Sequence, residues 1–191
     1  NDLATQYATD SLFYFARLKQ GNLLRSMNNF VGAQIVYENL INGFPAHEMR
    51  YIAELSRADC MLALAGNDSD GLADAVIILE RLLDLPNLPL DFQAEAAQKW
   101  AFALIKSGSS EKAKEVLWLS VDRFIGDGEK AAALGAAGRY WLARSMLQLG
   151  EIFEKQDNLV EARKVYRQVI AYNLPGRHIA ISRVDQILEI E

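Results

Sequence analysis

Three side chains in this sequence could take part in acid–base or nucleophilic chemistry: His47, His178 and Cys60. A catalytic histidine or cysteine needs a convergent partner that accepts or supplies a proton. Both histidines follow a proline turn, far apart in the sequence, and each is interpreted as a surface residue at a helix start. Cys60 lies in the apolar stretch RADCMLALAG, which predicts a buried and inert thiol. We therefore predict no catalytic residue.

The acidic stretch NDSDGLAD, residues 67–74, has a composition that could bind calcium. An EF-hand loop needs oxygen ligands at its first and twelfth positions and glycine at its sixth. With Gly71 at the sixth position, the first is Gly66 and the twelfth is Ile77, so the pattern fails. A solvated turn that caps the next helix is predicted here, and GDGE, residues 126–129, is interpreted in the same way. No phosphate-binding, zinc-protease or nucleophile-elbow motif is present, so neither a metal nor a cofactor is predicted.

Charge and hydropathy exclude two further classes of partner. The net charge is −5, from 25 acidic and 20 basic residues. The sequence contains no cluster of lysines and arginines that could bind along a phosphate backbone. Uncharged apolar runs are far shorter than the roughly 20 residues that span a bilayer. We predict no nucleic-acid partner and no membrane span. No signal peptide is visible in the start, NDLATQYATD. Its first residue is Asn1 and not methionine, which predicts a processed chain or a fragment of a larger protein.

The elements that must position any site are helices, because apolar residues recur at helical spacing in four segments. Each segment repeats one five-residue stripe at i, i+3, i+4, i+7 and i+8, opened by an alanine that lets two helices approach closely. The stripes are Ala33, Val36, Tyr37, Leu40 and Ile41; Ala75, Ile78, Leu79, Leu82 and Leu83; Ala113, Val116, Leu117, Ser120 and Val121; and Ala162, Val165, Tyr166, Val169 and Ile170. Recurrence of one helix-pair unit is typical of an all-α solenoid.

The stripes and turns predict nine helices. They lie near residues 3–26, 29–42, 46–65, 71–84, 90–107, 110–125, 128–155, 158–172 and 177–189. The last helix carries Ile181, Val184, Ile187 and Leu188 on one face and is predicted to cap the array. Trp100, Trp118 and Trp141 are predicted to lie in the core. AAALGAAG, residues 131–138, is predicted to be a close-packing face inside a long helix.

The first and fourth segments resemble the tetratricopeptide-repeat family in particular residues. That family places glycine in helix A, a small residue at the start of helix B, an aromatic residue four positions later and then a proline. The first segment matches with Gly21, Leu24, Ala33, Tyr37 and Pro45, and the fourth with Leu149, Gly150, Phe153, Ala162, Tyr166 and, one place late, Pro175. The second and third segments depart from the pattern, with Ala58 and Ala101 in place of the glycine.

This resemblance implies a right-handed α-solenoid of about four antiparallel helix pairs in a single domain, 1–191. The implied repeats lie near 13–45, 50–89, 93–125 and 128–175, followed by a capping helix at 177–190. The four alanines are 42, 38 and 49 residues apart, longer than the family unit of about 34. Long helices of this kind are similar in style to bacterial envelope-assembly tetratricopeptide lipoproteins. That style favours the periplasm or cell envelope over the cytoplasm.

The resemblance also implies a function, a non-catalytic scaffold that binds a protein or peptide on a concave groove lined by the A helices. Carried over by offset, the implied binding positions are Phe15, Leu18, Asn22 and Arg25; Leu55 and Asp59, with Ile52 and Leu62; Phe102, with Glu95, Gln98 and Ile105; and Arg144 and Glu151, with Leu147 and Glu154. The alternative is that the longer helices bury many of these positions in the core.

Some family members hold a terminal carboxylate with a clamp of basic residues. Here Asn22 occupies one clamp position, but Leu18, Ser56 and Glu95 stand at others, so the clamp is predicted to be absent. Two further functions remain open. One is an accessory helical domain of a larger bacterial envelope enzyme or assembly complex. The other is a homo-oligomerisation module joined through the aromatic N-terminal stretch LFYFARL, residues 12–18.

Overall fold

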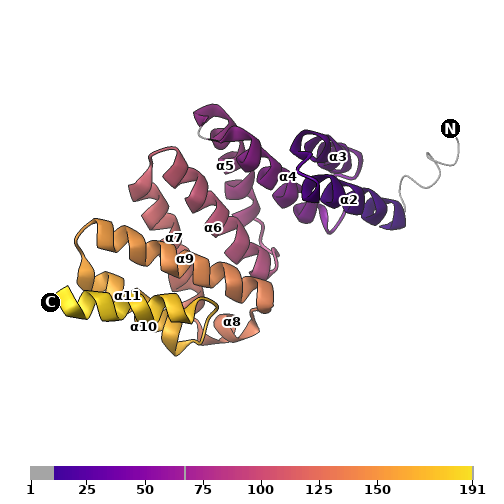
Figure 1. The fold of residues 1–191 in the computed structure, drawn as a ribbon. Helices are drawn as coiled ribbons and strands as arrows, with labels where there is room; N and C mark the ends of the chain where they lie inside the picture. Colours follow the sequence, from indigo (N-terminus) through magenta and orange to yellow (C-terminus); the bar gives the residue numbers. More distant parts are fainter. Residues whose placement is uncertain (1–10, 67, 191) are drawn as a thin grey trace, which may run out of the picture. The chain divides into compact units, whose positions relative to one another are not determined.

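The fold was analysed in a computed structural model that describes residues 11–66 and 68–190 (Figure 1). Every regular element in this described part is an α-helix, which confirms the all-α class. Residues 3–10 of the first predicted helix lie outside the described residues. The chain divides into two compact units, Asn1–Asp84 and Leu85–Glu191. The single domain and the repeat boundaries named above stay predictions.

The first unit consists of two helix hairpins. Its helices are α2 (Ser11–Ser26), α3 (Phe30–Gly43), α4 (Arg50–Ala65) and α5 (Ser69–Leu83). Each helix packs mainly on the next along the chain, α2 on α3, α3 on α4 and α4 on α5. The predicted cap before α5 is confirmed, because the Asp68 carboxylate accepts a hydrogen bond from the Gly71 backbone N–H at 3.2 Å. Sequential packing of this kind buries a continuous core between neighbouring helices.

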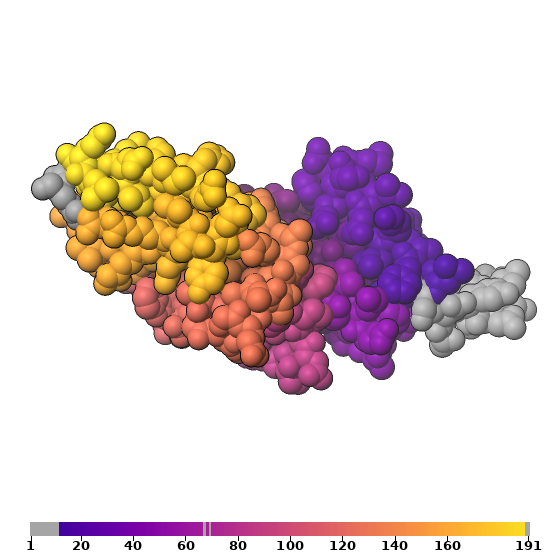
Figure 2. All heavy atoms as spheres, turned by 90° about the horizontal axis from the view of Figure 1, so that it is seen from below, coloured from indigo at the N-terminus to yellow at the C-terminus, as the bar shows by residue number. Residues whose placement is uncertain are grey.

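The second unit contains two further hairpins and a final helix. Its helices are α6 (Leu90–Lys106), α7 (Ser110–Ile125), α8 (Gly128–Ala133), α9 (Ala136–Lys155), α10 (Leu159–Ala171) and α11 (Arg177–Ile190). α6 pairs with α7, α9 pairs with α10, and α6 also packs on α9. α11 packs on α10, and Figure 2 shows its yellow atoms lying against the orange atoms of the preceding helices. The predicted capping helix is therefore present.

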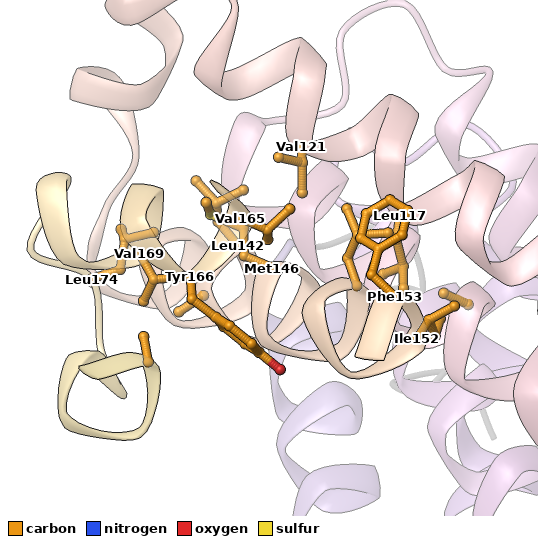
Figure 3. Packing of buried hydrophobic residues seen from close by; sticks show 14 of the residues in the cluster. Leu117, Val121, Leu142, Met146, Ile152, Phe153, Val165, Tyr166, Val169 and Leu174 are labelled. Carbon is orange, nitrogen blue, oxygen red and sulfur yellow. The ribbon is translucent and has the colours of Figure 1, made fainter. Parts of the chain in front are cut away.

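The four predicted stripes form the core. All their positions are buried except Leu83 and Ile170, which are half-buried. Figure 3 shows the fourth stripe from close by, with Val165, Tyr166 and Val169 of α10 among the packed side chains of the core. On α11 the buried face differs from the predicted one. Ala180, Val184 and Ile187 are buried, whereas Ile181 and Leu188 are exposed. The prediction was wrong for those two residues, because α11 turns the face with Ala180, Val184 and Ile187 toward the core of the second unit.

The glycine–aromatic pairs of the first and fourth repeats explain how closely their helices approach. A Cβ atom on Gly21 would lie 2.5 Å from the ring of Tyr37, and one on Gly150 would lie 2.5 Å from the ring of Tyr166. Both tyrosine side chains are completely or almost completely buried. Only glycine leaves room for a ring at this distance, so the residue pattern has a direct steric cause.

The predicted long helix at 128–155 is two helices, and the prediction was wrong there. Leu134 takes an extended conformation, with φ −65° and ψ 130°, so α8 ends before it and α9 begins after Gly135. The Gly135 N–H donates to a carboxylate oxygen of Asp91 at 2.9 Å. A Cβ atom on Gly138 would collide with the same carboxylate. The small-residue face therefore receives Asp91 of α6, a partner that lies inside the chain.

Candidate binding groove

The side chains with reactive groups lie apart from one another. His178 is exposed at the start of α11, as predicted. Cys60 is buried in α4, as predicted, and burial raises the pKa of its thiol to about 11. Within residues 11–66 and 68–190, no three histidine, cysteine or acidic side chains gather as a possible metal site.

His47 is not the surface residue that the sequence predicts. Its ring stacks on Tyr14 with centroids 3.7 Å apart, and Phe15 and Phe44 meet it edge-on. Its Nδ1 accepts a hydrogen bond from the Met49 N–H at 3.2 Å. α4 begins after this turn, at Arg50, and not at residue 46 as predicted. The aromatic residues of α2 recruit the histidine into a packed cluster, a contact between segments that local spacing does not reveal.

The three tryptophans differ in how far they are exposed to solvent. Trp100 and Trp141 are half-buried and pack against the core of the second unit. Trp118 is 47% exposed, so its prediction as a core residue was wrong. It lies on α7 beside the buried stripe and touches Phe153 edge-to-face at 6.3 Å. Its exposed ring contributes to the surface of α7 and not to the hydrophobic interior.

The apolar binding positions predicted in the first unit are largely covered. Leu18 and Leu55 are buried, at 7% and 4% exposure, so at these two positions the structure supports the core alternative. Phe15 is 42% exposed and packs edge-on against Tyr14 and His47. This part of the predicted surface therefore offers one open aromatic ring and no apolar channel.

The polar positions predicted in the first unit are engaged with one another or with the core. Asn22 accepts a hydrogen bond from the buried Tyr37 hydroxyl at 2.7 Å. Arg25 of α2 forms an ion pair with Asp59 of α4. These three predicted residues come together, but as internal contacts between helices. A partner that used them would have to compete with bonds already made.

The second unit contains an open groove between α6, α9 and α11, with a volume of about 360 Å³. It is lined by Gln98 of α6; Tyr140, Ala143, Arg144, Leu147, Gln148 and Glu151 of α9; Pro175 and Gly176 of the next turn; and Ile179 of α11. Four of these residues, Gln98, Arg144, Leu147 and Glu151, belong to the positions implied by the repeat. Phe102 lies further along α6, half-buried, with the Lys106 ammonium 5.2 Å from its ring centre.

Sequence reasoning missed the rest of this lining. Tyr140 lies four residues before Arg144 and shares its helix face, so the same periodicity could have found it. Pro175, Gly176 and Ile179 were missed because α11 was treated as a cap. α11 follows a B helix, and so stands where the A helix of another repeat would stand. Its first turn therefore closes one side of the groove.

The charged side chains Arg144 and Glu151 lie at opposite ends of the groove. The Arg144 guanidinium donates to the Tyr140 hydroxyl at 3.2 Å and lies 5.7 Å from the Trp141 ring centre. At the other end Glu151 is exposed. Across the part of the chain that the structure describes, neither Arg144 nor Glu151 makes an ion pair. Gln98 donates to Gln148 at 3.3 Å on the wall between α6 and α9. The groove thus offers a cation, an apolar middle and an anion.

Comparison with known proteins supports the repeat. The tetratricopeptide-repeat family matches residues 144–173, which run from the middle of α9 to the turn after α10. No curated protein matches the chain. The described helices include none that is long and apolar enough to cross a membrane. The family match, the close packing of Gly150 against Tyr166 and the helix hairpin that carries both lead to one conclusion: α9 and α10 form a tetratricopeptide repeat.

Proposed function

We propose that this chain is a non-catalytic scaffold that holds a segment of a partner protein in the groove between α6, α9 and α11. Tetratricopeptide repeats are in general protein–protein interaction modules, and the match at residues 144–173 supports that class. The observation that carries the proposal is the meeting of Arg144, Leu147 and Glu151 in one open groove. Among their counterparts in the first repeat, Leu18 is buried and Asn22 accepts a hydrogen bond from Tyr37, so that only Phe15 is open, whereas all three of these residues line the groove.

The dimensions of the groove suit a short peptide. Tyr140 and Glu151 are eleven residues apart on α9, about 16 Å at a rise of 1.5 Å per residue. That length accommodates roughly five extended residues or three turns of a ligand helix. Apolar contact with Leu147 and Ile179, together with polar contacts at both ends, is the usual composition of a peptide-binding groove.

Selection of binding peptides from a phage-display library (panning) tests the proposal. A random twelve-residue peptide library displayed on phage is selected on the whole chain, and the enriched peptides are synthesised. Their affinities are then measured for the double variant Leu147→Gln/Ile179→Gln, which removes the apolar middle without adding charge. The control is Leu119→Gln/Ile181→Gln, two exposed apolar residues that do not line the groove.

The expected result is a loss of about tenfold or more in affinity for the groove variant, because apolar contact area disappears. The control should bind as the wild type does. Equal binding by all three proteins would place the binding surface outside this groove and reject the proposal. Thermal unfolding of each variant checks that it remains folded.

Self-association is a second candidate function, favoured by one observation on α2. Leu12 is 74% exposed and Phe15 is 42% exposed, so two large apolar side chains face solvent one turn apart. Sedimentation velocity over a hundredfold range of concentration tests this candidate. We expect a dimer in the wild type that Phe15→Ser weakens. A wild type that stays monomeric at the highest concentration would remove the candidate.

A further inference from the structure

We propose that the segment held in this groove is acidic, and that its carboxylate side chains bind Arg144, which lines the groove, and two further arginines beside the turn after α10. This inference rests on the proposed function of the groove and adds the chemistry of the ligand. The three residues are Arg139 and Arg144 of α9 and Arg177 at the start of α11. We call them the arginine end.

Each guanidinium at the arginine end has a neutral partner. Arg139 donates to the backbone carbonyl oxygens of Asn173 and of the residue before it, both at 3.0 Å. Arg177 donates to the side-chain oxygen of Asn173 at 3.0 Å, and Arg144 donates to the Tyr140 hydroxyl. In the described ranges no carboxylate pairs with any of the three. The hydrogen bonds orient the groups and leave their charge uncompensated.

Several other cations of the second unit are neutralised inside the chain. Lys99 pairs with Glu95 on α6, and Arg183 of α11 lies 3.6 Å from a carboxylate oxygen of Glu154. The chain as a whole carries five more acidic than basic residues. An arginine cluster without acidic partners is therefore a local feature and not a consequence of excess basic residues. A ligand carboxylate would form charge-assisted, and in places bidentate, hydrogen bonds with it.

The remainder of the groove limits which anion fits. Glu151 lies two helical turns from Arg144, about 10 Å along α9, with Leu147 between them. A polyanion with evenly spaced phosphates would place charge against Glu151 as well as on the arginine end. A peptide can instead carry acidic side chains at one end, an apolar side chain over Leu147 and Ile179, and a neutral or basic residue at Glu151.

Three separate guanidinium groups also favour side-chain carboxylates over one terminal carboxylate. Arg139 and Arg144 come from α9, whereas Arg177 is the first residue of α11, so the positive charge extends over two elements. A single carboxylate accepts one bidentate arginine well, while a run of two or three acidic residues engages all of them. The proposed ligand is therefore an internal acidic segment followed by an apolar residue.

The experiment compares peptides that panning selects on the wild type with two charge-neutralised proteins. Arg144→Gln/Arg177→Gln removes two charges from the arginine end, and Arg144→Gln alone removes one. The matched control, Lys155→Gln/Arg167→Gln, removes two exposed charges from the same repeat outside the groove. We expect the selected peptides to be rich in aspartate and glutamate. Their affinity should fall at least tenfold for the double variant, less for the single variant and not for the control.

Salt provides a second measurement. The affinity of the wild type should fall between 50 and 500 mM NaCl, because the Debye length shortens from about 14 Å to about 4 Å. The arginine variant should show a smaller salt dependence. Peptides that lose affinity for Leu147→Gln/Ile179→Gln but not for the arginine variant would leave the groove proposal standing and overturn the acidic ligand. Peptides that bind both variants as tightly as the wild type would overturn both the groove proposal and the acidic ligand.

Two further results would also overturn the acidic segment. One is a loss of binding when the C-terminus of a selected peptide is amidated, which would assign the arginine end to a terminal carboxylate. The other is tight binding of a twelve-nucleotide oligothymidine that the arginine variant abolishes, which would assign it to phosphates. Circular dichroism and thermal unfolding of the variants show that any loss of affinity occurs in folded protein.

Discussion

The hairpins α2–α3 and α9–α10 share a packing rule and differ in the face they offer. In both, a glycine of the first helix receives a tyrosine ring of the second, Gly21 with Tyr37 and Gly150 with Tyr166. The other sides of the two A helices differ. Leu18 of α2 is buried, whereas the corresponding Leu147 of α9 is half-exposed and lines the groove. The repeat rule therefore determines how two helices pack, while the neighbours of each A helix determine whether it can bind.

Charges differ between the two hairpins in the same way. Arg25 of α2 is neutralised by Asp59 of the next A helix, so its charge stabilises a contact within the fold. Arg144 of α9 rests on aromatic rings, and no described carboxylate pairs with it. One arginine is a structural residue and the other is a candidate for ligand binding, although both occupy A-helix positions implied by one family pattern.

The largest expected difference between the hairpins comes from one substitution made at corresponding positions. Leu18→Glu places an unpaired carboxylate in the first core and should lower the free energy of unfolding by about 3–5 kcal/mol. Leu147→Glu leaves its carboxylate at the open groove and should cost about 1 kcal/mol or less. Urea denaturation monitored by circular dichroism measures both values. Similar losses in the two variants would mean that Leu147 is as much a core residue as Leu18.

The second prediction uses the alkaline titration of Cys60, which lies in the first unit and has no counterpart in the second. Burial raises its folded pKa to about 11 from an ordinary value of 9.0. The protonated thiol therefore stabilises the folded state fully below pH 9, and this stabilisation is lost as the pH rises through 11. The full loss is about 3 kcal/mol for two pKa units.

Cys60→Ala tests that titration. The variant should be less stable than the wild type at pH 8, because it leaves a small cavity in α4. Its stability should then fall less steeply between pH 9 and 11, because only the wild type carries the thiol. Tyr14, Tyr37 and Tyr166, whose pKa values burial also raises, contribute equally to the two profiles. Parallel pH profiles of the two proteins would contradict the buried thiol as the source of the loss.

The packing rule itself was predictable from sequence because it is local. A stripe at helical spacing and a glycine some sixteen residues before an aromatic residue can both be read within one hairpin. The stripes are buried, and the glycines meet the tyrosines they were paired with through the family pattern. The groove was predicted in part, for Gln98, Arg144, Leu147 and Glu151, because helix periodicity also places the outer face of α9.

The features that the sequence did not predict depend on contacts between residues that are far apart in the chain. At the break between α8 and α9, the Gly135 N–H donates to Asp91, a residue 44 positions earlier in the chain. His47 is half-buried because the aromatic residues of α2 pack against its ring. The arginine end forms only when Arg139 of α9 and Arg177 both donate to Asn173 in the turn after α10. Periodicity describes one helix at a time and carries no information about these contacts.

The third prediction tests whether the two glycine–tyrosine contacts are equivalent. Gly21→Ala and Gly150→Ala each place a Cβ atom 2.5 Å from a buried ring. Alanine favours the helix by about 1 kcal/mol, but overpacking costs about 1–3 kcal/mol or more, so both variants should lose stability. Gly43→Ala is the control, because its Cβ atom would meet no other atom within 4 Å. A glycine variant as stable as this control would show that the hairpin can relax around the methyl group.

The smallest expected difference separates the two arginines. Arg25→Gln breaks a partly buried ion pair with Asp59 and should lower the free energy of unfolding by up to about 1 kcal/mol. Arg144→Gln breaks no ion pair among the described residues and should change stability by less than about 0.5 kcal/mol. Peptide affinity should reverse this order, with a loss in Arg144→Gln and none in Arg25→Gln. Denaturation gives the free energy of unfolding of each variant, and a binding assay gives the peptide affinity of each. A stability loss in Arg144→Gln equal to that in Arg25→Gln would mean that Arg144 serves the fold, and its weakened binding would then be a consequence of altered structure.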